Sequence, residues 1–341
     1  MVPSFWTKSG TAVRKPGETY FHGTAEKYNP ASPSDLYDEG AYEYLFDAYG
    51  YPDEWSKSRS GWVRRTITLD SRSPQKRRVL HFEAVAPRCR VFLNGDLVGS
   101  NDDAMLPFDV DVTMASAGDQ ELVVQVLDYE EDDKGRTLTP SGNFFTRNIA
   151  GIWQDVWLEE RGEVFVEDVT IRTSVRRGEI ELIYQVTNAS DAPKSVVLTP
   201  SILRWRADGA AGLAAGPKFA PTTLDLAPEK TCEHRIVQPW TDAALWNPES
   251  PVLHVLHSEI AIDGRPVDEH DERFGFREVW LDGPDIMLNG YPIHLFSDWG
   301  HKVTPYHHTE AWIRQWFGMI RDANMNHTRL HTHPHPSITL D

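Results

Sequence analysis

Three histidines alternate near the end of the chain, at His331, His333 and His335. Alternate residues of an extended strand point to the same side, so three imidazole rings could converge on one metal ion such as Zn²⁺. Pro334 and Pro336 interrupt that strand, because proline cannot donate to a sheet ladder. A metal-dependent hydrolase is therefore kept as an alternative, while the sequence predicts neither a resident metal ion nor a cofactor.

The elements around these histidines follow a strand, helix, strand order. Asn289-Gly290 predicts a tight turn before a strand at 291–297, and extended character resumes at 327–331. Between them, a helix is expected at 309–323, where apolar residues recur at helical spacing. Two strands joined through a helix form a βαβ unit, so we expect them to be parallel.

Polar side chains follow both of these predicted strands. Asp298 and His301 come just after the first strand, and Arg329, His331 and His333 lie at the end of the second. Parallel neighbours end at the same edge of a sheet, so these groups should lie close together. They can hydrogen-bond one another, or they can accept from and donate to a ligand.

Ahead of this unit the chain has a β pattern. Residues 1–60 are rich in turn-forming residues and are expected to be an irregular lead-in. From Gly61 to about residue 162, apolar residues alternate with polar ones. Within this region, Asn94-Gly95 between apolar runs predicts a hairpin with a type I′ turn. Many short strands without a helical period favour a β-sandwich.

A second β region is expected at 163–275. Residues 179–186 alternate cleanly, and further strands are predicted at 194–203, 231–238 and 252–262, with a mobile loop at 207–217. About seven strands in this length are typical of a small immunoglobulin-like sandwich. His254 and His257 lie on one of these strands and are interpreted as ordinary strand positions.

Composition narrows the class of partner. The chain has 341 residues, with 34 basic and 51 acidic side chains and a net charge of −17. Such a charge repels phosphate backbones and anionic lipid, so neither nucleic acid nor a membrane surface is expected as a partner. The sequence as given shows no signal peptide, which favours the cytoplasm, and Cys89 and Cys232 are expected to be structural thiols.

Several motifs in register resemble glycoside hydrolase family 2. The resemblance covers about residues 61–341 in the family's order. It rests on Phe82 to Val85, Val91 to Gly95, Pro107 to Thr113, Gly151 to Val156, Trp246 to Pro251, Phe274 to Glu278, Leu288 to Ile293, and Asn326 to Pro334.

The resemblance implies a retaining β-glycosidase with a carbohydrate substrate. Its parts would be a jelly-roll sugar-binding domain at 1–162, an immunoglobulin-like sandwich at 163–275 and the start of a (β/α)₈ barrel at 276–341. In this family two glutamates of the barrel act as nucleophile and acid/base, with carboxyl groups ~5–5.5 Å apart. A barrel needs ~250 residues, so we expect both glutamates to lie outside this chain and the chain alone to be inactive.

By the same resemblance, Asp298, His301, Arg329, His331 and His333 are candidate sugar-binding residues. Two positions depart from the family pattern. Aligning Arg329 with Pro334 places Thr332 where the family usually has histidine, and 144–148 carries no acid where several members have Asp. Arg147 and Asn148 are the candidate substitutes at that second position.

A non-catalytic carbohydrate-binding or assembly module is the second alternative, in which the final βαβ segment is vestigial. In either case an incomplete barrel leaves part of its helix without a covering neighbour. Trp316 and Phe317 are therefore expected to be exposed, and the chain is expected to self-associate through this segment or to leave it mobile.

Overall fold

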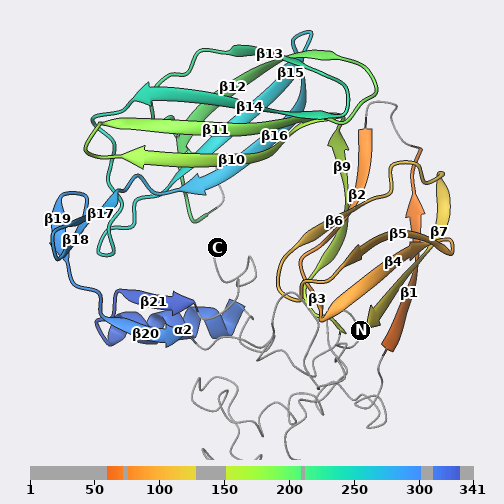
Figure 1. Cartoon of the computed structure of the whole chain (residues 1–341), viewed down its shortest axis with the longest axis horizontal. Helices are drawn as coiled ribbons and strands as arrows, with labels where there is room; N and C mark the ends of the chain where they lie inside the picture. The colour runs from red at the N-terminus through yellow and green to blue at the C-terminus, as the bar shows by residue number, and fades with distance from the viewer. Residues whose placement is uncertain (1–59, 72–75, 128–150, 209–211, 301–309, 331–341) are drawn as a thin grey trace, which may run out of the picture. The chain divides into compact units, whose positions relative to one another are not determined.

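A computed structural model describes residues 60–71, 76–127, 151–208, 212–300 and 310–330, without the side chains of 298–300, 311–312 and 330 (Figure 1). The fold is mainly β, as predicted. The chain divides into two compact units, which comprise Met1–Ser73, Arg78–Glu160 and Phe296–Asp341, and Pro74–Arg77 and Arg161–Leu295. In the described residues, no helix combines the length and apolarity needed to cross a membrane.

The first unit contains a β-sandwich around its own hydrophobic core. One sheet has the order β1-β7-β4-β5, a second has the order β6-β2-β9, and β3 pairs with β8. Leu80, Phe82, Val91 and Val124 are among the residues buried between the sheets. The strands are β1 (Ser60–Leu69), β2 (Lys76–Phe82), β3 (Val85–Ala86), β4 (Arg88–Leu93), β5 (Asp96–Asn101), β6 (Phe108–Asp111), β7 (Gly118–Leu127), β8 (Gly151–Ile152) and β9 (Val156–Gly162).

The predicted hairpin at Asn94-Gly95 is confirmed. Both residues have positive φ, at 52° and 90°, as a type I′ turn requires. The Asn94 side chain also fixes the turn to the neighbouring strand, because its Oδ1 accepts from the Glu121 N–H at 2.8 Å and its Nδ2 donates to Gln120 Oε1 at 2.6 Å.

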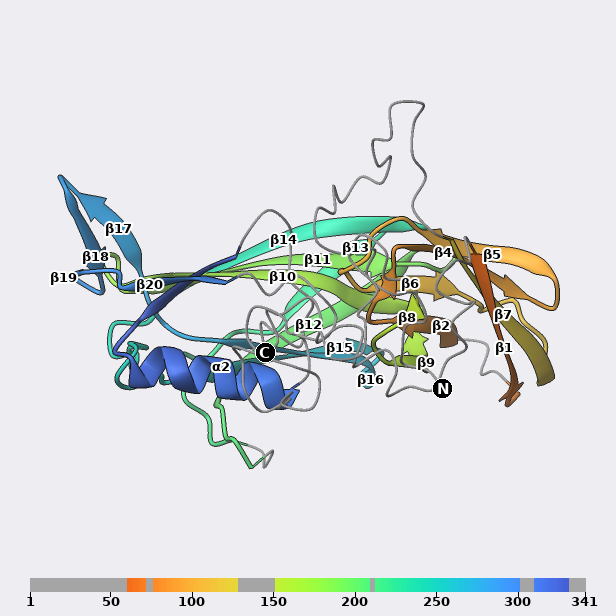
Figure 2. The same cartoon turned by 90° about the horizontal axis from the view of Figure 1, so that it is seen from below.

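The second unit contains a seven-stranded sandwich, as the strand count predicted. Figure 2 shows the sheet β10-β11-β14 lying over the sheet β13-β12-β15-β16. Between them the Tyr184 hydroxyl and Ser258 Oγ are both buried and hydrogen-bonded at 2.8 Å. The strands are β10 (Val164–Ser174), β11 (Glu179–Asn188), β12 (Lys194–Arg204), β13 (Thr222–Leu226), β14 (Lys230–Pro239), β15 (His254–Ile262) and β16 (Arg265–Phe274).

The loop predicted at 207–217 returns along β12 in its described part. Leu213 O accepts from the Arg204 N–H at 2.8 Å, and the Ala215 N–H donates to Ile202 O at 3.0 Å. These bonds satisfy backbone groups of β12 beyond the end of β13. Residues 209–211 lie outside the described part of the chain.

The predicted strand at 291–297 is wrong as a single element. Its first part, β19 (Tyr291–Ile293), pairs antiparallel with β18 (Asp285–Leu288), which also pairs with β17 (Val279–Asp282). A separate strand, β20 (Ser297–Gly300), follows and pairs elsewhere. The run from Tyr291 to Phe296 is almost continuously apolar or aromatic, so its periodicity carries no signal for where the pairing partner changes.

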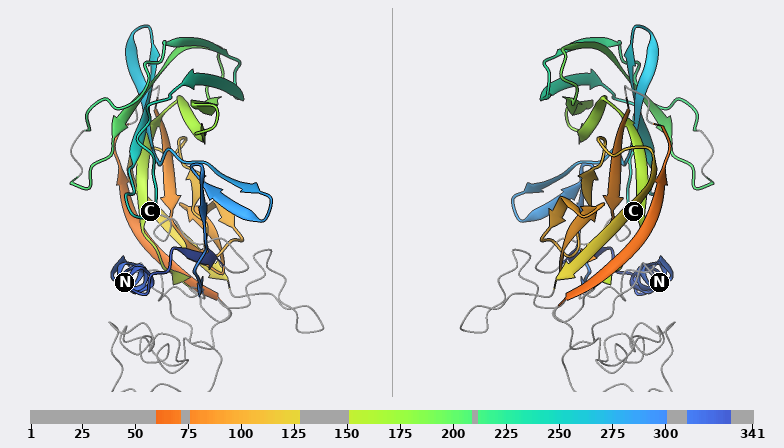
Figure 3. Two further views of the ribbon diagram at one scale, coloured as in Figure 1. Left: turned by 90° about the vertical axis from the view of Figure 1, so that its left-hand side faces the viewer. Right: turned by 90° about the vertical axis from the view of Figure 1, so that its right-hand side faces the viewer.

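The βαβ prediction is confirmed at the level of strand direction. Strand β20 pairs in parallel with β21 (His327–Leu330), and α2 (Glu310–Asp322) lies between them in the chain. Figure 3 views α2 nearly end-on, beside the two strands. The expectation that Trp316 is exposed is wrong, because this residue is buried together with Ile313, whereas Phe317 is 38% exposed.

Helix α2 ends in a Schellman motif. Asn324 has a φ of 56°, its N–H donates to Arg321 O at 2.9 Å, and the Met325 N–H donates to Ile320 O at 3.0 Å. These two bonds satisfy carbonyl groups that have no partner inside the helix. The stop at Asn324 was expected from the sequence, and it returns the chain to β21.

Candidate functional site

Strands β20 and β21 form the site at which sugar-binding residues were predicted. Asn326 fixes the start of the pair, since its Oδ1 accepts from the Phe296 N–H at 3.0 Å and its own N–H donates to Phe296 O at 3.1 Å. One residue further along, the Ser297 hydroxyl is hydrogen-bonded to His327 Nδ1. These contacts set the register of every following residue pair.

The register places two predicted site residues one step apart. Asp298 lies opposite Thr328, and Arg329 lies opposite Trp299. Asp298 is therefore inside β20, rather than directly after the strand as expected. The Thr328 hydroxyl is buried and has no hydrogen-bond partner in the described residues, so this register position keeps unused hydrogen-bonding capacity.

The other predicted site residues lie outside the described part of the chain. These are His301, His331, His333, Arg147 and Asn148, together with His335 of the alternative metal site. Among the residues that the structure describes, no group of three or more His, Cys, Asp or Glu side chains is placed to hold a metal ion. The roles expected for these residues stay predictions.

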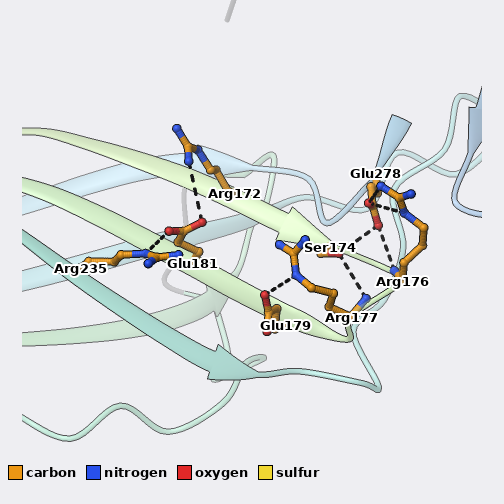
Figure 4. A network of polar contacts seen from close by, with 8 residues as sticks. All are labelled: Arg172, Ser174, Arg176, Arg177, Glu179, Glu181, Arg235 and Glu278. Carbon is orange, nitrogen blue, oxygen red and sulfur yellow. Dashed lines mark hydrogen bonds and ion pairs between the residues drawn. The ribbon is translucent and has the colours of Figure 1, made fainter. Parts of the chain in front are cut away.

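A second cluster connects the immunoglobulin-like sandwich to strand β17 (Figure 4). Its centre is Glu278, whose side chain is only 11% exposed. One carboxylate oxygen accepts from Ser174 Oγ at 3.1 Å and from the Arg176 N–H at 2.9 Å. The other accepts from Arg176 Nε at 2.7 Å. We call Ser174, Arg176 and Glu278 the latch.

The electrostatics of the latch favour an ionised Glu278. Burial disfavours the charged carboxylate, but hydrogen bonds from the Arg176 side chain and backbone and from Ser174 outweigh it and lower the pKa of Glu278. Arg176 also stacks over the Trp280 ring at 4.5 Å from its centre. An ionised, hydrogen-bonded carboxylate of this kind holds two segments together and is a poor proton donor.

Asn289 extends the latch toward the next hairpin. Its Oδ1 accepts from the Glu278 N–H at 2.9 Å, and its Nδ2 donates to Trp246 O at 2.8 Å. Arg277 lies over the Trp246 ring at 4.3 Å. Three of the motifs that carried the family resemblance, around Trp246, Glu278 and Asn289, therefore meet in one place.

The sequence shows the motifs that contain Trp246, Glu278 and Asn289, but it does not predict that these residues are in contact. The signal available was the Asn289-Gly290 turn, which predicts left-handed backbone at both residues and is observed with φ values of 53° and 95°. Nothing in a period of two or 3.6 indicates that an asparagine of this turn reaches a tryptophan 43 positions earlier.

We assign structural roles to three further ionisable residues of the described part, His254, His257 and Cys89. Burial, with a contribution from the charge of Arg204, lowers the pKa of His254 to about 4, and this ring meets Trp240 edge-on at 5.1 Å. His257 Nδ1 is 2.6 Å from Asp271 Oδ1. Both histidines are strand positions, as predicted. Cys89 is a free, buried thiol, and burial raises its pKa to about 12.

Comparison with known families covers both sandwiches. Residues 25–161 match the family model described as glycosyl hydrolases family 2, sugar binding domain. Residues 164–277 match the model described as glycosyl hydrolases family 2. Both matches fall on the regions in which the sequence motifs resembled this family.

Curated relatives extend well beyond the matched region. A β-galactosidase from Thermoanaerobacter pseudethanolicus is 24% identical over 299 residues, which cover 80% of this chain and 38% of that protein. A β-glucuronidase from Paenibacillus borealis is 25% identical over 249 residues, covering 67% of this chain and 38% of that protein. The chain thus spans well under half the length of these relatives.

Solved structures share the fold. The GH2 β-galacturonidase from Eisenbergiella tayi, determined with galacturonate, has a TM-score of 0.71 at 22% identity over 85% of this chain and 49% of that one. β-Glucuronidase 2 from Bacteroides uniformis has a TM-score of 0.69 at 21% identity, over 82% and 34% respectively. The two family models, which together cover most of the sequence, show that the chain belongs to glycosyl hydrolase family 2.

Proposed function

We propose that these 341 residues are the N-terminal part of a retaining β-glycosidase that hydrolyses O-glycosidic bonds in carbohydrates. The observation that carries the proposal is the parallel pairing of β20 with β21 across α2, directly after two family 2 sandwiches. Such a unit is the repeating element of a (β/α)₈ barrel, in which active-site groups gather at the C-terminal ends of the strands.

In this proposal Asp298 and Arg329 contact the sugar with His301, His331 and His333, while Arg147 and Asn148 contribute from the first domain. An aspartate accepts hydrogen bonds from two sugar hydroxyls, and arginine donates to their oxygens. The parallel pairing places the two residues on neighbouring strands of one sheet, one register position apart.

The catalytic glutamates of the proposed enzyme lie outside these residues. Retaining hydrolysis needs a nucleophilic carboxylate and a second carboxyl with a raised pKa. In the described part of the chain, Asp268 is a carboxyl whose pKa is raised, through burial. Asp268 Oδ2 accepts from the Val166 N–H at 3.0 Å beside the bulge in β10, which is a structural position.

Chromogenic β-glycosides test the proposal directly. The purified chain is incubated with the 4-nitrophenyl β-galactoside, β-glucuronide, β-galacturonide and β-mannoside. No turnover should persist through repurification, because both carboxyls of the catalytic pair are expected to lie outside these residues. Turnover that co-elutes with the chain and disappears on a single Glu→Gln change within it would contradict the assignment.

Sugar contact is tested separately by saturation-transfer NMR with the methyl glycosides of the same four sugars. We expect weak transfer to one of them, lost in Asp298→Asn and in Arg329→Ala but retained in Arg314→Ala. Arg314 is the control because it lies on α2 and pairs with Glu310 one turn away, at 2.8 Å. Equal transfer in all variants would refute the sugar-binding roles.

A further inference from the structure

Strand β14 forms an open edge of the immunoglobulin-like sandwich. Its 10 residues pair with β11 along their whole length without a bulge. On its other side β14 has no strand neighbour among the described residues, so it lies at one border of the sheet β10-β11-β14 (Figure 2). A long, regular edge of this kind presents a row of backbone N–H and C=O groups with which another strand can pair.

The other borders of this sandwich are less suited to pairing with a further strand. Strand β10 has a bulge between Val166 and Asp168, and the β15-β16 ladder shifts its register at Ile260. Strand β13 has only 5 residues. Bulges and short strands are devices with which natural proteins prevent edge-to-edge association. Strand β14 has neither, and its proline, Pro239, lies at its very end.

The side chains of β14 point alternately to the core and to the outer face of the sheet. Cys232 and Ile236 pack against the core. The residues between and beside them are exposed and lie on the outer face; they are Thr231, Glu233, Arg235 and Val237. The outer face therefore carries one negative and one positive charge, two positions apart.

Both charged groups keep hydrogen-bonding capacity. Glu233 accepts from Gln185 Nε2 at 3.0 Å through one oxygen, Oε2. Arg235 donates through Nε to Glu181 (Figure 4), which leaves the N–H groups of its two terminal nitrogens as donors. These contacts also hold both side chains on the sheet, and a side chain that is already ordered loses less conformational entropy in an interface.

Two copies of β14 can pair antiparallel about a twofold axis, and each possible register has one residue at that axis. Residues directly opposite each other in such a pair share a face and interact. With His234 at the axis, Glu233 lies opposite Arg235 of the second copy, and Arg235 lies opposite Glu233. With Glu233 at the axis two glutamates would face each other, and with Arg235 two arginines. Charge therefore selects the register about His234.

We propose that β14 is a dimer interface, in which two copies of this chain pair their β14 strands antiparallel about His234 and join two three-stranded sheets into one. The occupant is a second copy because the order Glu233, Arg235 is its own complement when reversed, as a twofold interface requires. Val237, which is 44% exposed, then lies opposite Thr231 of the second copy. The interface uses no residue of the βαβ unit and does not depend on the proposed hydrolysis.

Sedimentation equilibrium tests the interface. One strand pair is small beside a standard interface of ~1,600 Å², so the chain is followed from about 1 μM to about 1 mM. The net charge of −17 on each copy adds long-range repulsion, which ~0.15 M NaCl screens beyond ~8 Å. Under these conditions we expect a reversible equilibrium between monomer and dimer.

Glu233→Lys should weaken the dimer at least tenfold in Kd, because it places a lysine opposite Arg235 at both ends of the pair. Within one copy it removes a hydrogen bond to Gln185 at an exposed position, so the fold should be retained. Glu269→Lys is the matched control. Glu269 is an exposed residue of β16, and its substitution changes the net charge equally but should leave Kd unchanged.

Oxidative cross-linking tests the register without a charge change. In Ile236→Cys the new thiol lies opposite Cys232 of the second copy, so a mild oxidant should join two chains through disulfides. Within one copy the two thiols are four positions apart on one strand, ~13 Å, which is too far for a disulfide. Lys230→Cys is the control, because position 230 lies opposite Gln238 and far from either Cys232. Cys89 is buried and present in every variant.

Three outcomes would overturn the proposal. They are a monomer at every concentration, equal Kd values for Glu233→Lys and Glu269→Lys, and cross-linking of Ile236→Cys that does not exceed that of Lys230→Cys. Association through the helix of an incomplete barrel would also be distinguished, since it would persist in Glu233→Lys and would leave Ile236→Cys without cross-links. That result would assign self-association to α2 and overturn the role of β14.

Discussion

Replacing Glu278 with glutamine should destabilise the immunoglobulin-like unit far more than replacing the half-buried Glu179 at the start of β11. The substitution keeps the shape of the side chain but removes its charge. It also turns one acceptor oxygen into an NH₂ group that faces the donors of Arg176 and Ser174. Donor then faces donor in a place where Ser174 is buried.

The magnitude follows from the contacts. Hydrogen bonds to charged groups contribute ~1.5–3 kcal/mol each. Arg176 is 56% exposed, so water takes over its side-chain bonds and that ion pair counts as a surface pair, ~0.2–1 kcal/mol. The buried Ser174 hydroxyl has no such replacement. We therefore expect Glu278→Gln to cost ~2 kcal/mol and to lower the Tm of this unit by roughly 6–10 °C.

The matched control is Glu179→Gln. Glu179 of β11 pairs with Arg177 of the preceding turn at 2.5 Å, but Arg177 is largely exposed and Glu179 is half-buried (Figure 4). Exposed pairs of this kind contribute ~0.2–1 kcal/mol. Differential scanning calorimetry of the unaltered chain and the two variants measures both effects under the same conditions.

The stabilising effect of Glu278 depends on pH in a direction that its lowered pKa determines. The folded-state pKa of Glu278 lies below its ordinary value of 4.5, so its stabilising effect is present above that value and is lost as the pH falls through the folded pKa. The difference between the unaltered chain and Glu278→Gln should shrink in acid. An equal cost for Glu278→Gln and Glu179→Gln, or a difference that is constant into strong acid, would refute the role given to the latch.

The remaining predictions concern a turn, a buried histidine and the histidine row. Gly95→Ala should lower the free energy of unfolding by ~1–2 kcal/mol, because Gly95 has a φ of 90°, which disfavours a Cβ even though no atom lies near it. Gly318→Ala in α2 should raise the free energy of unfolding by ~0.5–1 kcal/mol. Urea unfolding that ranks the two variants the other way would contradict the strain argument. His254 stays neutral in the fold, so the free energy of unfolding of the unaltered chain should fall relative to that of His254→Phe as the pH drops from 6.5 to about 4. A difference that stays constant across that range would exclude the lowered pKa. Elemental analysis should find no stoichiometric zinc, and zinc that is lost in His331→Ala would support the metal-dependent alternative.

Much of the fold could be predicted because it depends on local patterns. Alternation in residues 179–186 predicted a half-buried strand, and the structure has β11 there with alternate residues in the core. The Asn94-Gly95 and Asn289-Gly290 turns were predictable because few residues accept two successive positive φ values. The end of α2 at Asn324 follows from the same tolerance of left-handed backbone.

Contacts between distant segments were beyond such patterns. The sequence places Glu278 in a family motif, but only the folded chain brings Ser174 and Arg176 to it across about a hundred positions. Burial of Trp316 reverses what the incomplete barrel suggested, since exposure depends on which neighbours pack on a side chain rather than on its type.

The segment from β19 to β21 contains both features that its sequence predicts and features that only the fold determines. The sequence predicted a strand, a helix and a second strand, with the two strands parallel, and these are observed. Tertiary structure decided that the first strand splits into β19 and β20. It also decided that Asp298 lies opposite Thr328 in the register. Register is fixed by hydrogen bonds to a partner strand, such as those of Asn326 with Phe296, and a strand's own sequence does not contain its partner.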